Sequence, residues 1–172
     1  MEINVDIDIQ AVSKENYVSG LADYNHSMLE GNDWMSLKNC TFLDHLIAGE
    51  KTSDKEIWDA YEKYYFDDWT WISKPFGISE VERAIKKLKD LDDTVSKMPF
   101  CPMDRDWTND ENKAITEIVE QTFEDSIHLF VFPWDANEEE PMGSWKLRKI
   151  LERALLNMRK MPEDTVFYLE MV

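Results

Sequence analysis

Two aspartates one residue apart, Asp104 and Asp106, are the residues of this sequence whose spacing most suggests catalysis. They stand in a run that reads Asp-Arg-Asp-Trp-Thr. In such a pair one carboxylate can attack phosphorus while the other acts as acid and base. That chemistry needs the pair at the end of a hydrophobic strand, whereas Pro99 and Pro102 interrupt the preceding residues. A small metal-dependent phosphoesterase that uses Asp104 and Asp106 is therefore kept only as a second alternative.

Other chemically capable residues lack a suitable context. Glu111 and Lys113 follow Asp104 with the spacing of a nuclease metal site, but they fall at an expected helix start rather than on adjacent strands. The three histidines have no spacing suited to zinc: His26, His45 and His128. The glycines lie too far apart to form a phosphate-binding loop. We therefore expect a protein that is not an enzyme, with no catalytic residue, no metal and no cofactor.

The strongest functional signal is the net charge. The chain has 36 Asp and Glu against 19 Lys and Arg, which gives a formal net charge of −17. A charge of this size repels itself and disfavours the compact state, although it also promotes solubility and fast encounter with oppositely charged partners. Direct binding to nucleic acid or an anionic membrane is disfavoured, because those partners require Lys and Arg. The expected partner is therefore a basic surface on another protein.

The surplus charge is concentrated in residues 101–140, which hold twelve acids and two bases and so carry −10 of the −17. Carboxylates three or four positions apart on a helix lie about 5–6 Å from each other, close to the spacing of successive phosphates on a nucleic-acid strand. The candidate partner-binding residues are Asp104, Asp106, Asp110, Glu117, Glu120, Glu124, Asp125, Asp135, Glu138, Glu139 and Glu140.

A second interpretation is that these acids form an ordinary solvated face. They would then be balanced in part by the basic residues of the final helix, which are Lys146, Arg148, Lys149, Arg153, Arg159 and Lys160. Pairing within the chain would use up some of the acidic surface. The separation of charge also permits self-association, for example as a homodimer.

The composition indicates one α+β domain that spans residues 1–172. Hydrophobic residues make up 43% and aromatic residues 12% of the chain, too much for a disordered acidic tail. Residues 3–9 alternate apolar and polar side chains perfectly, as a half-buried strand does. Residues 127–132 and 165–172 are two further strand candidates. We expect a small sheet of about three strands, N-terminal, central and C-terminal, packed with five or six helices.

Three of these helices are predicted from a Ser or Thr cap followed three residues later by Glu: Ser53 with Glu56, Ser79 with Glu82, and Thr108 with Glu111. An earlier helical stretch begins at Ser13 and extends through Tyr17 and Leu21 to Tyr24. A short helix is expected around residues 42–47. The final helix spans residues 144–159, and its expected core face consists of Leu147, Ile150, Leu151, Ala154, Leu155 and Met158.

The cellular location is inferred from what the sequence lacks. Cys40 and Cys101 stand in no paired or metal-binding motif, so a disulfide framework is not expected. The longest apolar run, residues 127–134, is too short to span a bilayer and contains Pro133. These features predict a cytoplasmic protein, in the host cytoplasm if the chain is phage-encoded.

The function that best accounts for the charge is inhibition by mimicry of nucleic acid. The chain would occupy the basic groove of a nucleic-acid-binding enzyme, such as a restriction or CRISPR effector, with aromatic anchors such as Trp107 or Trp134. In size and charge it is similar to phage and mobile-element anti-defence proteins, a resemblance of type that carries over no residues. The nearest alternative is an immunity protein that neutralises a nuclease toxin.

Overall fold

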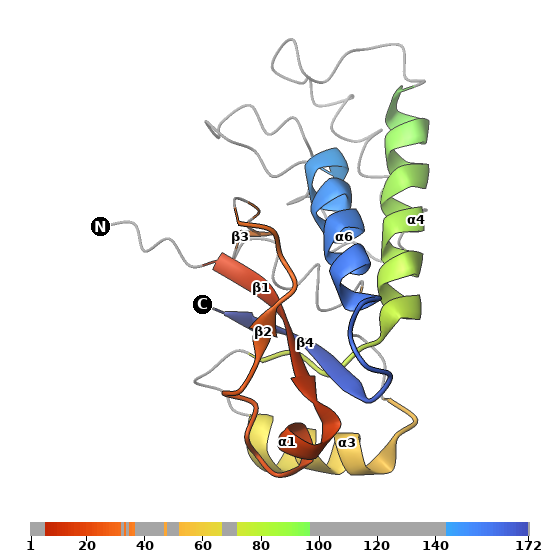
Figure 1. The fold of residues 1–172 in the computed structure, drawn as a ribbon. Helices are drawn as coiled ribbons and strands as arrows, with labels where there is room; N and C mark the ends of the chain where they lie inside the picture. The colour runs from red at the N-terminus through yellow and green to blue at the C-terminus, as the bar shows by residue number, and fades with distance from the viewer. Residues whose placement is uncertain are drawn as a thin grey trace, which may run out of the picture.

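The structure, a computed structural model, has an α+β fold (Figure 1). It describes residues 6–31, 33, 35–36, 47, 52–66, 72–96 and 144–171. Within those residues, four antiparallel strands form one sheet. The elements are β1 (Asp6–Ser13), α1 (Lys14–Val18), β2 (His26–Ser27), β3 (Met35–Ser36), α3 (Lys55–Ala60), the π-helix η2 (Tyr61–Tyr65), α4 (Ile78–Ser96), α6 (Ser144–Met158) and β4 (Thr165–Met171).

The sheet is built around β1, the most central strand. One edge of β1 pairs with β4 along its length, from Ile7 opposite Met171 to Ser13 opposite Thr165. The other edge is shared by two short strands, since β2 pairs near Gln10 and β3 pairs near Ile7. The sheet is therefore three strands wide at any one point.

The outer edge of β4 is covered by an extended segment rather than left open. Ile72 and Phe76 form isolated bridges to Glu170 and Phe167. Between them, the Ser73 amide donates to the Leu169 carbonyl at 2.9 Å, and the Ser73 hydroxyl accepts from the Leu169 amide at 2.8 Å. Pairing of this kind removes exposed backbone groups that could otherwise recruit another strand.

The predicted terminal strands are both present. β1 extends to Ser13, four residues past the expected end, and residues 3–5 lie outside the described residues. β4 occupies the predicted C-terminal position. The predicted central strand at 127–132 lies outside the described residues, while β2 and β3 were not predicted. Four α-helices fall within the described part of the chain, so the total of five or six stays a prediction.

The N-terminal boundaries of α3 and α4 differ from those predicted from the sequence. Asp54, not Ser53, caps α3, because its side chain accepts from the amides of Glu56 and Ile57. The Ser79 cap was also wrong: α4 already includes Ile78, and the Gly77 amide donates to the Glu80 carboxylate at 2.9 Å. The helix predicted at Thr108 lies outside the described residues, as does most of the one around 42–47, of which only Ile47 is described.

The N-terminal helix was predicted correctly at its start and wrongly at its end. The Ser13 side chain accepts from the Asn16 amide at 3.2 Å, so Ser13 is the N-cap. However, α1 ends at Val18, well short of Tyr24. Gly20 has a φ of 76°, a left-handed conformation that glycine adopts without a Cβ clash and that stops a helix.

The sheet has a hydrophobic layer on each face. On one face, Val12, Val166 and Tyr168 pack with aromatic residues of α1, α3 and η2, chiefly Tyr17 and Tyr65. Neighbouring residues on a strand point to opposite faces, so Ile7, Ile9 and Leu169 face the other way; Figure 1 shows α4 and α6 side by side on that side. All six core residues predicted for the final helix are buried.

Candidate functional site

Two acidic side chains oppose each other at the end of the sheet face that α1 and α3 leave uncovered. Asp8 on β1 is directly opposite Glu170 on β4. Residues paired in this way project from the same face of a sheet, with their Cβ atoms about 4.5–5.5 Å apart. Both side chains are half-buried. The first and last strands of the described chain thus bring two carboxylates together, which we call the carboxylate pair.

Polar side chains of the sheet and of the loop after α1 hold the carboxylate pair in place. The Ser27 hydroxyl donates to Asp8 Oδ1 at 2.8 Å, and Gln10 Nε2 lies 3.2 Å from Asp8 Oδ2. The Asn25 amide lies 3.2 Å from Glu170 Oε2 and 2.8 Å from the Tyr168 hydroxyl. Hydrogen bonds of this kind fix the orientation of ionised groups.

The environment of the carboxylate pair disfavours two negative charges. Burial raises the pKa of Asp8, against a lowering effect of the hydrogen bond from Ser27. Burial also raises the pKa of Glu170, and repulsion from Asp23 and Asp8 adds to it. Among the described residues that act on either pKa there is no Lys or Arg. The pair is therefore a place where a cation from outside the described residues would be stabilised.

Large apolar side chains lie exposed around the loop that follows α1. Tyr24 and Phe66 are each 69% exposed, while Leu21 and Tyr64 are each 45% exposed. A Cβ on Gly20 would lie 3.0 Å from the Tyr64 ring, so this loop touches the end of η2. Exposed aromatic residues are common anchors in protein interfaces. Sequence reasoning missed Tyr24 and Phe66, because it placed Tyr24 within a helix and did not consider Phe66.

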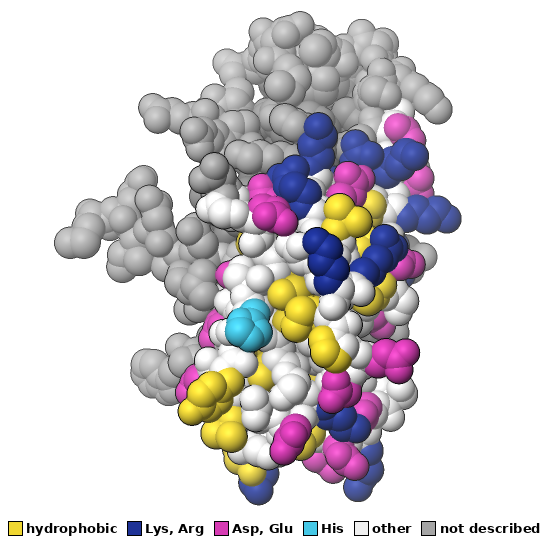
Figure 2. Space-filling model, in the orientation of Figure 1, with side chains coloured by type: hydrophobic (Ala, Val, Ile, Leu, Met, Phe, Trp, Pro, Cys, Tyr) yellow, Lys and Arg dark blue, Asp and Glu magenta, His cyan; other side chains and the backbone are white. Residues whose placement is uncertain are grey.

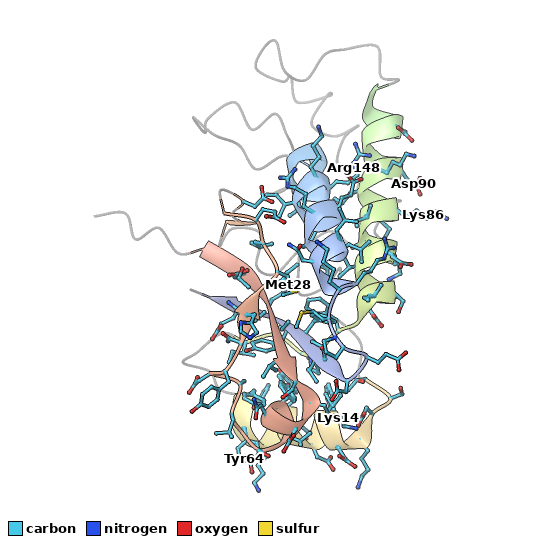
Figure 3. All side chains as sticks on the ribbon, in the orientation of Figure 1. Lys14, Met28, Tyr64, Lys86, Asp90 and Arg148 are labelled. Atoms are coloured by element: carbon cyan, nitrogen blue, oxygen red, sulfur yellow. The ribbon has the colours of Figure 1, made fainter. Side chains whose placement is uncertain are left out.

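Basic side chains are concentrated on the other helix pair. Figure 2 shows most of the visible Lys and Arg side chains over the upper half of the described surface, where α4 and α6 lie. In Figure 3, Lys86 and Asp90 project outward from α4. Two arginines have acidic partners: Arg153, within α6, forms a two-point ion pair with Asp33, and Arg159, directly after α6, lies 3.0 Å from Glu82.

The residues predicted from the sequence to bind a partner are not among those that the structure describes. Every one of the eleven carboxylates falls in the range 104–140, as do the expected aromatic anchors Trp107 and Trp134. The Asp104 and Asp106 pair of the phosphoesterase alternative lies in the same range. Of the basic residues predicted for the final helix, Arg153 pairs with Asp33 and Arg159 with Glu82, and both of these acids lie outside residues 101–140.

A cavity of about 360 Å³ opens where the start of α3, the turn before α4 and the start of β4 meet. Its walls combine apolar groups such as Ile57 and Phe76 with hydroxyls of Thr52 and Thr165. Glu80, its acidic residue, already accepts from the Gly77 amide and the Ser79 hydroxyl. No chemical feature of its described lining singles out a ligand class.

No three His, Cys, Asp or Glu side chains in the described ranges form a group that could hold a metal ion. Among the helices that the structure describes, none combines the length and apolar composition that crossing a bilayer requires. Comparison of the chain with models of protein families, with curated proteins and with solved structures finds no match.

Proposed function

We propose that this chain is a non-enzymatic binding protein that mimics nucleic acid and thereby inhibits a nucleic-acid-handling protein. The observation that carries the proposal is the density of acids in residues 101–140, where twelve acids and two bases give a net charge of −10. A row of carboxylates at phosphate-like spacing offers Lys and Arg side chains the charge pattern of a nucleic-acid strand. The partner is a protein with a basic groove, such as a restriction or CRISPR effector.

The ion pairs of two basic residues, Arg153 and Arg159, support this proposal. Arg153 and Arg159 could have neutralised the acidic segment from within the chain, but their ion pairs are with Asp33 and Glu82. Each of those two arginines is thus engaged by an acid outside residues 101–140. Exposed aromatic side chains such as Tyr24 and Phe66 add surface that could anchor a protein contact.

The test uses purified chain as bait in a pull-down at low and at moderate salt, with captured proteins identified by mass spectrometry. Electrostatic association weakens steeply as salt rises. We expect capture of a nucleic-acid-handling protein, its displacement by duplex DNA, and loss of its DNA-dependent activity when the chain is added. A captured toxin with nuclease activity would instead identify an immunity protein.

Two triple variants with the same change in net charge locate the surface. Reversal of Glu117, Glu120 and Glu124 to Lys changes the proposed face. The control reverses three exposed acids elsewhere on the chain: Glu15, Glu62 and Glu163. We expect the first variant to lose capture and the control to retain it. Equal capture by both variants, or equal loss, would contradict mimicry by residues 101–140.

A further inference from the structure

The side-chain oxygen of Gln10 is a buried acceptor without a hydrogen-bond partner. Gln10 is 6% exposed, and its Oε1 receives no hydrogen bond. Its Nε2 donates to Asp8 Oδ2 at 3.2 Å. This bond fixes the amide, because the flipped orientation would set Oε1 against a carboxylate oxygen. The unpaired oxygen therefore belongs to a side chain that contacts the Asp8 carboxylate through the nitrogen of the same amide group.

The same place holds two like charges that no described cation offsets. Asp8 and Glu170 are directly opposite on β1 and β4. Their described partners are a hydroxyl and two amides, from Ser27, Gln10 and Asn25. Like charges at directly opposed positions destabilise a sheet. A buried unpaired acceptor and an uncompensated pair of carboxylates each cost free energy, and a cation that contacts all three side chains would relieve both costs.

We propose that Asp8, Glu170 and Gln10 bind a divalent cation that prefers oxygen ligands, Mg²⁺ or Ca²⁺. Carboxylate and amide oxygens are the ligands that these hard cations select over softer metals. Ser27 and Asn25 would not bind the cation themselves but would orient the two carboxylates through their hydrogen bonds. The cation would neutralise the pair and give Gln10 Oε1 its partner.

The ligand set predicts a site of modest affinity. Two carboxylates fall short of the three acidic or metal-binding side chains that a protein-built metal centre commonly has, and none of the described residues form such a group of three. Water would complete the coordination, as is usual for Mg²⁺. Motif spacing had predicted no metal, but it cannot detect ligands at opposite ends of a chain that meet only through strand pairing.

The experiment titrates the full, chelator-treated chain with MgCl₂ and, separately, with CaCl₂ by isothermal calorimetry. Thermal unfolding is followed under the same conditions, with NaCl at equal ionic strength as the control for screening. We expect saturable binding of one cation per chain, together with a melting temperature that rises more than in NaCl. The titration with the larger binding constant identifies the preferred cation.

Two isosteric variants, Asp8→Asn and Glu170→Gln, test the ligands. Each should weaken binding by about tenfold or more, a typical cost of disturbing a metal site. Without metal, the same variants should melt at or above the wild-type temperature, because each removes a like-charge contact. We therefore expect weaker cation binding together with an unchanged or higher melting temperature without metal. Misfolding would lower both. The matched control is Glu163→Gln, which removes one exposed charge outside the sheet and should bind as wild type does.

Three results would overturn the proposal. The first is that neither cation binds saturably to the folded wild-type chain. The second is that Asp8→Asn and Glu170→Gln bind the cation as tightly as wild type. The third is that binding is lost on Asp104→Ala and Asp106→Ala while Asp8→Asn retains it. The last result would place the metal at the aspartate pair of the phosphoesterase alternative. Circular dichroism on every variant checks that the chain is folded.

Discussion

The hydroxyl of Tyr65 donates a hydrogen bond of 2.6 Å to the backbone carbonyl of Tyr17, while the two rings lie 4.4 Å apart. Tyr17 belongs to α1 and Tyr65 to η2, so one side chain joins two helices at the sheet face. Within η2, Tyr65 is buried whereas its neighbour Tyr64 is half exposed. This contact therefore joins two members of the cluster of Tyr17, Tyr65 and Tyr168, which we call the tyrosine layer.

Substitution of Tyr65 by Phe should lower the free energy of unfolding by about 0.5–1.5 kcal/mol, because a buried hydrogen bond is lost while the ring is kept. The Tyr17 carbonyl keeps its bond from the Gly20 amide, at 3.1 Å, and that from the Ser19 amide. Urea denaturation measures the change. Tyr64→Phe is the control, and a loss as large as that of Tyr65→Phe would show that the hydroxyl contact is not the cause.

The tyrosine layer should also make the fold sensitive to alkali. Burial raises the pKa of Tyr65 from 10.0 to about 12, and burial raises the pKa of Tyr17 and of Tyr168 in the same direction. Above pH 10 the unfolded chain therefore releases these protons before the folded chain does. The free energy of unfolding is unaffected by these groups below pH 10 and falls as pH rises towards 12.

Each such tyrosine contributes a slope of up to about 1.4 kcal/mol per pH unit in this interval. Urea unfolding at a series of alkaline pH values, with phenolate absorbance followed in parallel, measures the effect. Tyr65→Phe should give a shallower decline than wild type, because it removes one of the titrating groups. An identical decline in both proteins would show that Tyr65 does not contribute.

The N-cap of α3 gives a third prediction. Asp54 Oδ1 accepts from the Glu56 amide at 3.0 Å, and its Oδ2 lies 2.8 Å from Lys14 Nζ. Asp54→Ala removes the cap and should cost about 1 kcal/mol of unfolding free energy. Asp54→Asn keeps a capping oxygen and loses only an exposed ion pair, so it should lower the free energy of unfolding by about a few tenths of a kcal/mol. Ser53→Ala should change the free energy of unfolding little. A larger loss in Ser53→Ala than in Asp54→Ala would show that Ser53 is the cap.

The sequence predicted features that depend on local periodicity and missed those that depend on strand pairing. Leu147, Leu151 and Ala154 were expected in the core because apolar residues recur at helical spacing, and they are buried. β2 and β3 have only two residues each and are strands because they pair with β1. Such short segments show no apolar periodicity from which the sequence could predict them. Asp8 and Glu170 meet only through the register of β1 with β4. For the acids of residues 101–140, the predicted site stays a prediction.

The end of α1 was missed because a single glycine outweighs the apolar spacing that continues past it. Gly20 has a φ of 76°, and a Cβ there would lie 3.0 Å from the Tyr64 ring. Gly20→Ala should therefore destabilise the fold by about 1–2 kcal/mol, through a left-handed conformation that alanine disfavours and contact with the ring. In Gly31→Ala the new methyl group meets nothing within 4 Å.

The two glycine variants are compared by urea denaturation. Both replace a glycine with alanine and so restrict the unfolded chain equally, which cancels the gain that such substitutions bring through the unfolded state. The difference between them isolates the cost at Gly20. Adding Tyr64→Ala to Gly20→Ala should recover the part of that cost due to ring contact and leave the backbone part. If Gly20→Ala is as stable as Gly31→Ala, then the turn that ends α1 does not require a left-handed residue.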